Sequence, residues 1–247
     1  MISTPTLFVL GAGASIPYGF PSGARLREVI CRMLHGPDFN FRCDQVAPFG
    51  FEPADVKRFV KAFHHSSIQS IDAFLARRTE FSSLGKLLIA SYIGAGESRE
   101  SLFGTNNDDN WYHALWNAML FDVHKIEELA SNRVRFVSFN YDRSLECFLH
   151  EATKNAYGVE DEIAIREWSK LGILHVYGSL GKFCFQPMNG GRTYRSELSQ
   201  QDLAIASSGI RVIPEARDDD DNLRSRETGS TGPRESTFSD SGLIRST

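Results

Sequence analysis

The chain has 247 residues, 41% of them hydrophobic, and a formal net charge of −4. This length can bury one sizeable core, and the slightly acidic balance gives no electrostatic argument for nucleic acid as a partner. No apolar run approaches the roughly 20 residues of a membrane span, and no basic-then-apolar leader opens the chain. We therefore expect a cytoplasmic protein that does not bind a membrane.

The four cysteines are too scattered for a zinc site, because no two of them form a Cys-x-x-Cys pair. They also give no sign of a secreted disulfide framework. We interpret them as small buried thiols in a reducing compartment and expect no metal. The positions are Cys31, Cys43, Cys147 and Cys184.

The first predicted strand, Thr6–Leu10, leads directly into the turn Gly11-Ala12-Gly13-Ala14-Ser15. A buried parallel strand that ends at small residues brings backbone N–H groups close to a phosphate. The segment therefore predicts a nucleotide-binding turn; a tight strand-to-helix turn without a ligand is the alternative. A second turn-rich segment, Gly19–Gly23, includes Phe20 and predicts a loop that lines the same pocket.

This turn differs from the dinucleotide fingerprint of ordinary dehydrogenases. That fingerprint needs a third glycine, and an acidic residue about 20 positions further on for the ribose. Here Ile16 occupies the third glycine position, and residues 27–34 have a helical pattern where a second strand should end in a carboxylate. The sequence therefore argues against a standard hydride-transfer enzyme.

Helical periodicity dominates the residues that follow. Ser22 is a suitable N-cap for the first helix, and Pro53 suits the first turn of the second. The helices lie between the first and second strands and predict an inserted helical layer at about residues 37–130. The expected helices cover residues 23–34, 54–63, 71–75, 84–92 and 111–130, with a polar loop at 104–110.

Strands and helices then alternate. Strands are expected at 134–139, 171–177 and 210–213, with helices at 142–152 and 198–206 between them. This order predicts an α/β fold with a Rossmann-like parallel sheet, whose ligands bind beyond the carboxyl ends of the strands. Gly11, Asn140 and Gly178 all lie at such ends. We expect one domain over residues 1–214 and a disordered polar tail over 215–247.

Two polar positions at these strand ends could carry chemistry. Asn140 ends a buried strand, where its amide could hold a ribose hydroxyl or a water, whereas Asp142 is better explained as a helix cap. By strand alternation, His175 and Tyr177 share one face. If that face points to the glycine turn, His175 could be a general base; the alternative is a core histidine with satisfied hydrogen bonds.

In combination, three motifs resemble the sirtuin-like superfamily: Gly11–Ser15, Asn140-Tyr141-Asp142, and His175–Leu180, in that order. Within it, the chain is most similar to zinc-free bacterial proteins that hydrolyse NAD in anti-phage defence. The segments Ser70–Leu75 and Ser138–Asp142 also resemble these proteins, and the resemblance spans Leu7 to Glu215.

This resemblance implies cleavage of the nicotinamide–ribose bond through an oxocarbenium-like state, with NAD as substrate. It also implies a homo-oligomer that is held inactive until a phage-derived or protein trigger acts. Asn140 would position the ribose or the attacking water, and His175 would be the base. The implied NAD-contacting residues are Gly11, Ala12, Gly13, Ser15, Phe20, Asp142, Tyr177, Gly178 and Ser179.

Three departures from the family pattern leave alternatives open. The zinc-binding cysteine pairs of deacylase sirtuins are missing, which argues against protein deacylation. Sirtuins have glycine directly after the catalytic histidine, whereas Val176 and Tyr177 intervene here, so Tyr177 is the alternative occupant of the base position. Relatives continue with a further strand where this chain has its polar tail. A non-catalytic module for NAD or ADP-ribose, or a truncated inactive homologue, is therefore the alternative function.

Overall fold

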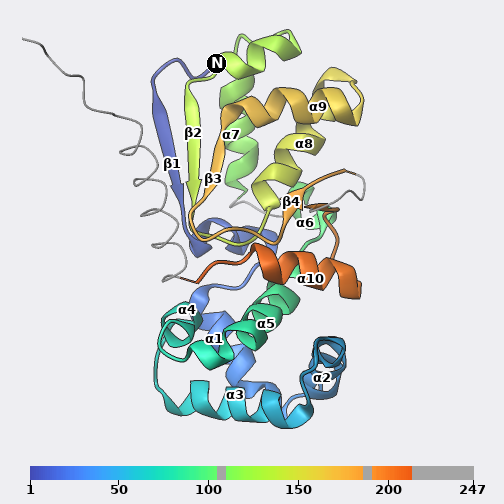
Figure 1. Cartoon of the computed structure of the whole chain (residues 1–247). Helices are drawn as coiled ribbons and strands as arrows, with labels where there is room; N and C mark the ends of the chain where they lie inside the picture. Colours follow the sequence, from blue (N-terminus) through green and yellow to red (C-terminus); the bar gives the residue numbers. More distant parts are fainter. Residues whose placement is uncertain (105–109, 186–190, 213–247) are drawn as a thin grey trace, which may run out of the picture.

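A computed structural model describes residues 1–104, 110–185 and 191–212. The fold is mixed α/β, with a three-stranded parallel sheet in the order β1 (Thr6–Leu10), β2 (Val134–Ser138) and β3 (Ile173–His175) (Figure 1). Leu10 pairs with Ser138, and Ser138 pairs with His175. The carboxyl ends of all three strands are therefore level with one another.

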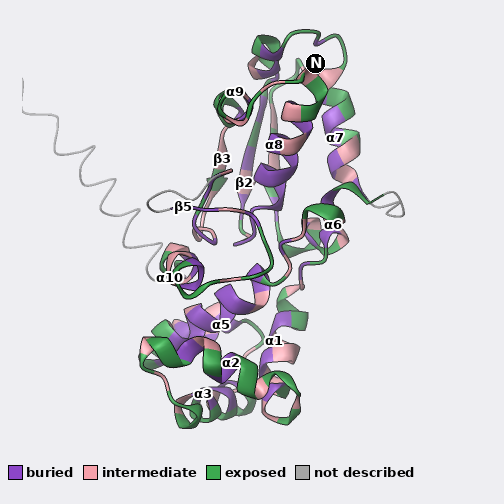
Figure 2. Ribbon diagram, turned by 90° about the vertical axis from the view of Figure 1, so that its right-hand side faces the viewer, coloured by how far each residue is buried: buried purple, intermediate pink, exposed green. Residues whose placement is uncertain are grey.

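Helices cover one face of this sheet. They are α7 (Trp111–Leu120), α8 (Ser144–Tyr157) and α9 (Asp161–Trp168), all on the same side in Figure 1. Buried residues concentrate in β2 and α8 and again in α5 (Ser82–Gly94), as Figure 2 shows. On the opposite face of the sheet Leu7, Val9 and Leu174 are 60%, 62% and 61% exposed.

A group of helices lies beyond the carboxyl ends of the strands (Figure 1). Its core is aromatic, because Phe59, Phe63, Phe74 and Phe81 are buried and pack on one another. Helix α10 (Gln200–Gly209) packs against α5 and lies between this group and the sheet. Besides α5, the group contains α1 (Gly23–Arg32), α2 (Asp38–Val46), α3 (Pro53–His65) and α4 (Ile71–Leu75).

Local sequence signals account for where several of these helices begin. Ser22 caps α1, its Oγ accepting a hydrogen bond of 3.2 Å from the Arg25 N–H, as predicted. Pro53 begins α3, as predicted. Among the described residues, no helix combines the length and the apolar character that crossing a membrane requires.

Three predictions about the elements are wrong, and several elements were not predicted. The helix expected at 111–130 ends at Leu120, because Asp122 has a left-handed backbone (φ 57°), and a 3-10 helix over Ile126–Ser131 follows. Strand β3 ends at His175 instead of Tyr177. Residue Ile210 forms only an antiparallel bridge with Gly178, so no fourth parallel strand is present up to residue 212. The sequence interpretation also missed α2, α6 (Arg99–Phe103), α9 and the short pair β4 (Lys182–Phe183) and β5 (Gly191–Arg192).

Parts of three predicted segments lie outside the described residues. These are residues 105–109 of the expected loop, Ile213 of the expected fourth strand, and the tail over 215–247.

Candidate functional site

The glycine turn follows β1 as predicted, and it includes a short 3-10 helix, Ala12–Ala14. Within the described part of the chain, the N–H groups of Ala12 and Gly13 have no hydrogen-bond acceptor. A Cβ added to Gly11 or Gly13 would meet no heavy atom within 4 Å. Packing inside the protein therefore does not require glycine at either position, whereas close approach of a ligand to the backbone would.

Asn140, just after β2, forms hydrogen bonds to this turn. Its Nδ2 donates hydrogen bonds of 2.9 Å to the Gly11 carbonyl and 3.0 Å to the Ser15 Oγ. Both N–H bonds of the amide are therefore used inside the protein. The Asn140 Oδ1 accepts no hydrogen bond from any described residue, so it remains available to a hydroxyl or a water.

His175 lies behind Asn140 and has both ring nitrogens occupied. Its Nδ1 donates to the Asn140 carbonyl oxygen at 2.8 Å, and its Nε2 donates to the Glu146 carboxylate at 2.7 Å. Burial opposes the charged imidazolium, but the Glu146 carboxylate outweighs this effect and raises the pKa of His175 to about 9. At neutral pH the ring is thus a cation that fixes Asn140, with no free nitrogen to accept a proton.

Asp142 does not occupy the N-cap position of α8, which is Arg143, but its side chain satisfies the first N–H of that helix. Asp142 is buried, and its Oδ1 accepts hydrogen bonds from the Ser144 N–H (3.1 Å) and the Ser144 hydroxyl. Burial raises the pKa of Asp142, although these hydrogen bonds and one from Ser15 favour its ionised form. The side chain also lines a cavity of about 10 Å³, roughly the size of one water, which adjoins Asn140 and His175.

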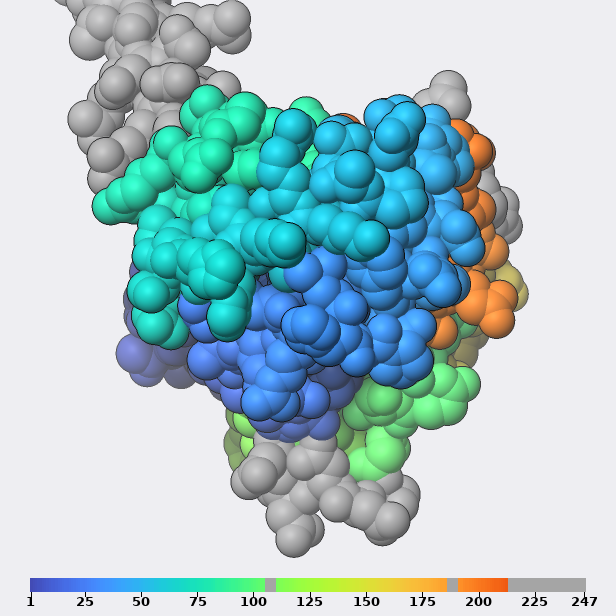
Figure 3. Space-filling view, turned by 90° about the horizontal axis from the view of Figure 1, so that it is seen from below, coloured from blue at the N-terminus to red at the C-terminus, as the bar shows by residue number. Residues whose placement is uncertain are grey.

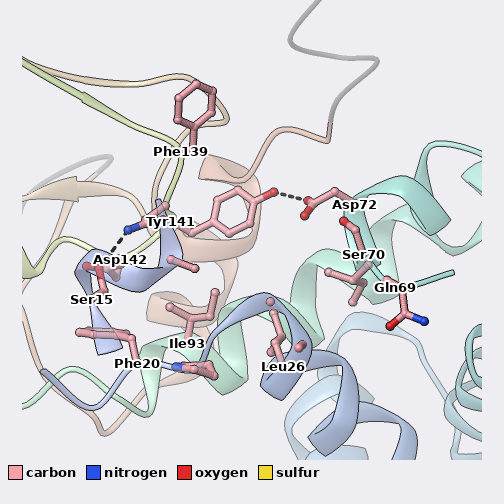
Figure 4. Close-up of a pocket in the computed structure, with 16 residues that line it drawn as sticks. Ser15, Phe20, Leu26, Gln69, Ser70, Asp72, Ile93, Phe139, Tyr141 and Asp142 are labelled. Atoms are coloured by element: carbon pink, nitrogen blue, oxygen red, sulfur yellow. Dashed lines mark hydrogen bonds between the residues drawn. The ribbon is translucent and has the colours of Figure 1, made fainter. Parts of the chain in front are cut away.

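A larger cavity of about 310 Å³ opens between this edge of the sheet and the helical group. In Figure 4 the Tyr141 hydroxyl points across it and donates a hydrogen bond to Asp72, at the start of α4. The other walls are largely apolar. The lining residues are Ala12, Ser15, Phe20, Pro21, Gly23, Ala24, Leu26, Gln69, Ser70, Ile71, Asp72, Ile93, Phe139, Asn140, Tyr141 and Asp142.

The sequence-based site prediction missed Gln69, Asp72 and Tyr141. Burial raises the pKa of Asp72, and the hydrogen bond from Tyr141 opposes that change. A carboxyl group with a perturbed pKa in a cavity is typical of functional sites. The sequence feature that could have pointed to Asp72 is the segment Ser70–Leu75. In this segment Ser70 caps α4 by accepting a hydrogen bond from the Ala73 N–H (3.3 Å).

Of the nine predicted contact residues, four line the 310 Å³ cavity: Ala12, Ser15, Phe20 and Asp142. Gly11 and Gly13 of the turn do not line it, and neither does His175.

The other three contact residues lie elsewhere. Tyr177 packs its ring against Phe139, with 5.8 Å between centroids, and Ser179 donates to the Gly181 carbonyl. At Gly178 a Cβ would come within 1.9 Å of the Gly209 carbonyl oxygen. Packing against the end of α10 therefore explains this glycine, and none of the three lines the 310 Å³ cavity.

Comparisons with known proteins add no relative. The chain matches no protein-family model, no curated protein and no solved structure. Among the described residues, no group of three or more histidine, cysteine or acidic side chains is placed to hold a metal ion.

Proposed function

We propose that this protein hydrolyses NAD at the nicotinamide–ribose bond, in a Rossmann-like domain that spans residues 1–214. The observation that carries the proposal is the cavity between the glycine turn and Asn140–Asp142, at the level ends of three parallel strands. Ligands of parallel α/β sheets bind at this edge. With about 310 Å³, the cavity lies at the lower end of the range of about 300–1,000 Å³ for small-molecule sites.

The N–H groups of Ala12 and Gly13, which have no acceptor among the described residues, suit the phosphates of NAD, because backbone donors at a turn bind anions. The apolar cavity beside them suits the flat nicotinamide ring. In NAD this ring is a cation, so the Asp72 carboxylate would stabilise it electrostatically. The cavity would take the nicotinamide riboside half, with the rest of the dinucleotide along the glycine turn.

Hydrolysis of the nicotinamide–ribose bond needs no strong base. The bond between the ribose C1′ and the ring nitrogen breaks, its electron pair neutralises the nicotinamide, and an oxocarbenium-like sugar is left. Water then forms the new C1′–O bond and loses its proton to solvent, giving ADP-ribose. The Asn140 Oδ1 would accept a hydrogen bond from this water, and His175 would act as a positioning residue through the Asn140 carbonyl.

The resemblance to sirtuin-like defence proteins supports a biological role for this reaction. We propose that the protein is an anti-phage effector that lowers cellular NAD. Under this proposal the chain forms a homo-oligomer and waits for a phage-derived or protein trigger, since free NAD hydrolysis would harm its own host.

The test is nicotinamide release from NAD by the purified full chain, followed by chromatography. Asn140→Ala should lose at least about 100-fold in turnover, because positioning errors at a reacting centre cost this much. Asn117→Ala is the control, since Asn117 is exposed on α7 and its amide only donates to the His113 carbonyl. No nicotinamide release by the wild type, with or without infected-cell extract, would contradict hydrolysis.

One observation favours a second candidate, a module that binds NAD or ADP-ribose without cleaving it. Both nitrogens of His175 are occupied, so the side chain predicted as the base has no free acceptor. Calorimetry separates the two proposals: saturable binding of NAD with no nicotinamide release selects the binding module. Equal loss of binding in Asn140→Ala and Asn117→Ala would contradict both.

A further inference from the structure

A second hollow, of about 490 Å³, lies between helices α1 and α3 in the helical group. These helices belong to the end of the molecule that Figure 3 shows from below, in blue to cyan. The hollow is lined mainly by basic side chains, and Glu28 is its one carboxylate. The lining residues are Arg27, Glu28, Cys31, Arg32, Leu34, His35, Val60, Lys61, His64 and His65. We call this hollow the α1–α3 groove.

The positive charge of the α1–α3 groove is only partly neutralised within it, since Glu28 pairs with Arg32 but no carboxylate pairs with Arg27 or Lys61 among the described residues. Glu28 is already paired with Arg25 and Arg32, each at 2.7 Å. Lys61 has no ion pair or hydrogen bond with any described residue. The groove therefore offers cationic donors that the described chain leaves without an anion, in a protein whose net charge is −4.

Arg27 is held in place for such a role. Its Nε donates a hydrogen bond of 2.9 Å to the Ile68 carbonyl, and its guanidinium lies over the Phe63 ring at 5.6 Å. The two terminal nitrogens make no hydrogen bond with described residues, so they are free donors on a fixed stem. A guanidinium that is ordered before binding loses little entropy when it binds a phosphate.

Basic residues elsewhere on α3 are arranged differently. Arg58 pairs with Asp55 at 3.1 Å, and the Lys57 ammonium lies over the Phe39 ring at 5.4 Å. Neither residue lines the groove. Lys57 lies outside the groove and, like Lys61, has no acidic partner among the described residues, so it offers a matched control for Lys61.

We propose that the α1–α3 groove binds a small, multiply charged phosphate compound, of the size of a nucleoside di- or triphosphate. Arginine and lysine are the usual donors for such groups, and here Arg27 on α1 and Lys61 on α3 line the same groove. The volume of about 490 Å³ is within the range of about 300–1,000 Å³ for small ligands. A long nucleic acid would need a basic stripe over a wider face, which the acidic net charge of the chain does not favour.

This site is separate from the cavity proposed for NAD. Helix α1 contributes to both, but with different residues: Gly23, Ala24 and Leu26 line the first, whereas Arg27 and Arg32 line the second. No residue lines both hollows. Binding in the α1–α3 groove therefore does not depend on the proposed NAD hydrolysis and can be tested without it.

The test is isothermal titration calorimetry of the full chain with inorganic tripolyphosphate. We expect saturable binding by the wild type, and an affinity lowered about tenfold in Lys61→Gln, because one charge-assisted hydrogen bond is lost. Arg27→Gln should have a similar effect. Lys57→Gln removes the same charge from the same helix, one turn away and outside the groove, and its affinity should fall clearly less than that of Lys61→Gln, because only the general electrostatic attraction changes and no hydrogen bond to the ligand is lost.

Thermal unfolding of each variant detects any loss of fold. If Arg27→Gln unfolds, Lys61→Gln still tests the proposal, because Lys61 has no ion pair or hydrogen bond with any described residue. Absence of saturable binding by the wild type would overturn the proposal. So would equal weakening in Lys57→Gln and Lys61→Gln, which would mean non-specific attraction. Tighter binding of a 20-residue single-stranded oligonucleotide than of tripolyphosphate would overturn the assignment to a small ligand.

Discussion

The imidazole of His175, at the end of β3, donates a hydrogen bond of 2.8 Å to the main-chain carbonyl of Asn140, just after β2. The side chain of Asn140 in turn donates to Gly11, just after β1. The ends of all three parallel strands are thus joined by two side chains. This relationship positions Asn140 at the cavity proposed for NAD, and its Oδ1 accepts no hydrogen bond from any described residue.

The His175–Glu146 pair makes stability depend on pH. The folded pKa of His175, about 9, lies above its ordinary value of 6.5. The stabilisation is therefore complete below about pH 6.5 and is lost as the pH rises through about 9. At about 1.4 kcal/mol per pKa unit, it amounts to about 3 kcal/mol. Urea unfolding should show His175→Gln less stable than wild type at pH 6.5, with the difference largely gone at pH 10.

Glu146→Gln provides the matching variant, because it removes the carboxylate that raises the pKa of His175. The imidazole signal of His175, followed by NMR, should then titrate at lower pH than in the wild type. A stability difference between wild type and His175→Gln that is the same at pH 6.5 and pH 10 would contradict this account.

Asp72→Asn should weaken NAD binding without lowering the stability of the fold. Burial raises the pKa of Asp72, so its ionised form is costly to the fold at neutral pH, and this cost grows as the pH rises through the folded pKa. The neutral asparagine should leave the protein at least as stable in urea unfolding, and it can still accept the Tyr141 hydrogen bond. The KM for cationic NAD should rise by about tenfold, as loss of one partly buried charge pair predicts.

Reduced NAD is the ligand control for Asp72→Asn, because its nicotinamide ring is uncharged. Its inhibition constant should change much less than the KM for NAD. An equal change for both ligands would mean that Asp72 does not act through charge.

Glu97→Gln should be strongly destabilising. Glu97 bonds the buried Arg143 at 2.9 Å and the buried Arg192 at 2.9 Å, and all three side chains have 0% exposure. Removing the carboxylate leaves the buried Arg143 without its acidic partner and Arg192 with only the 3.9 Å pair with Asp202, which should cost about 3–5 kcal/mol in urea unfolding. Glu151→Gln breaks only the partly exposed pair with Arg99 and should change stability by less than about 1 kcal/mol. Similar effects of the two variants would refute this interpretation.

The sequence predicted the three strands of the parallel sheet because each is a short apolar run followed by glycine or asparagine within a few residues. The turn after Leu10 and the position of Asn140 followed from the same pattern. The convergence of Asn140 and His175 was also predictable, because level ends of parallel strands lie at one edge of a sheet.

What the sequence could not predict depends on contacts between distant residues. The pairing of Glu146 with His175 joins α8 to β3, and periodicity gives no information about it. Helix α7 ends early because Asp122 adopts a left-handed conformation in an otherwise helical pattern. Asp72 enters the cavity because the helical group folds back onto the strand ends, an arrangement that no local signal specifies.

The central claim is that one ligand lies between the glycine turn and Asn140, and Gly13→Ala tests it most directly. A Cβ at Gly13 would meet no atom within 4 Å, so the melting temperature should stay close to that of wild type. Gly36→Ala, far along the chain and with only ordinary contacts from 3.7 Å, is the control. Nicotinamide release should fall at least about tenfold in Gly13→Ala and stay unchanged in Gly36→Ala, because a methyl group would occupy the space of the phosphate. Equal release by Gly13→Ala and wild type would contradict the account.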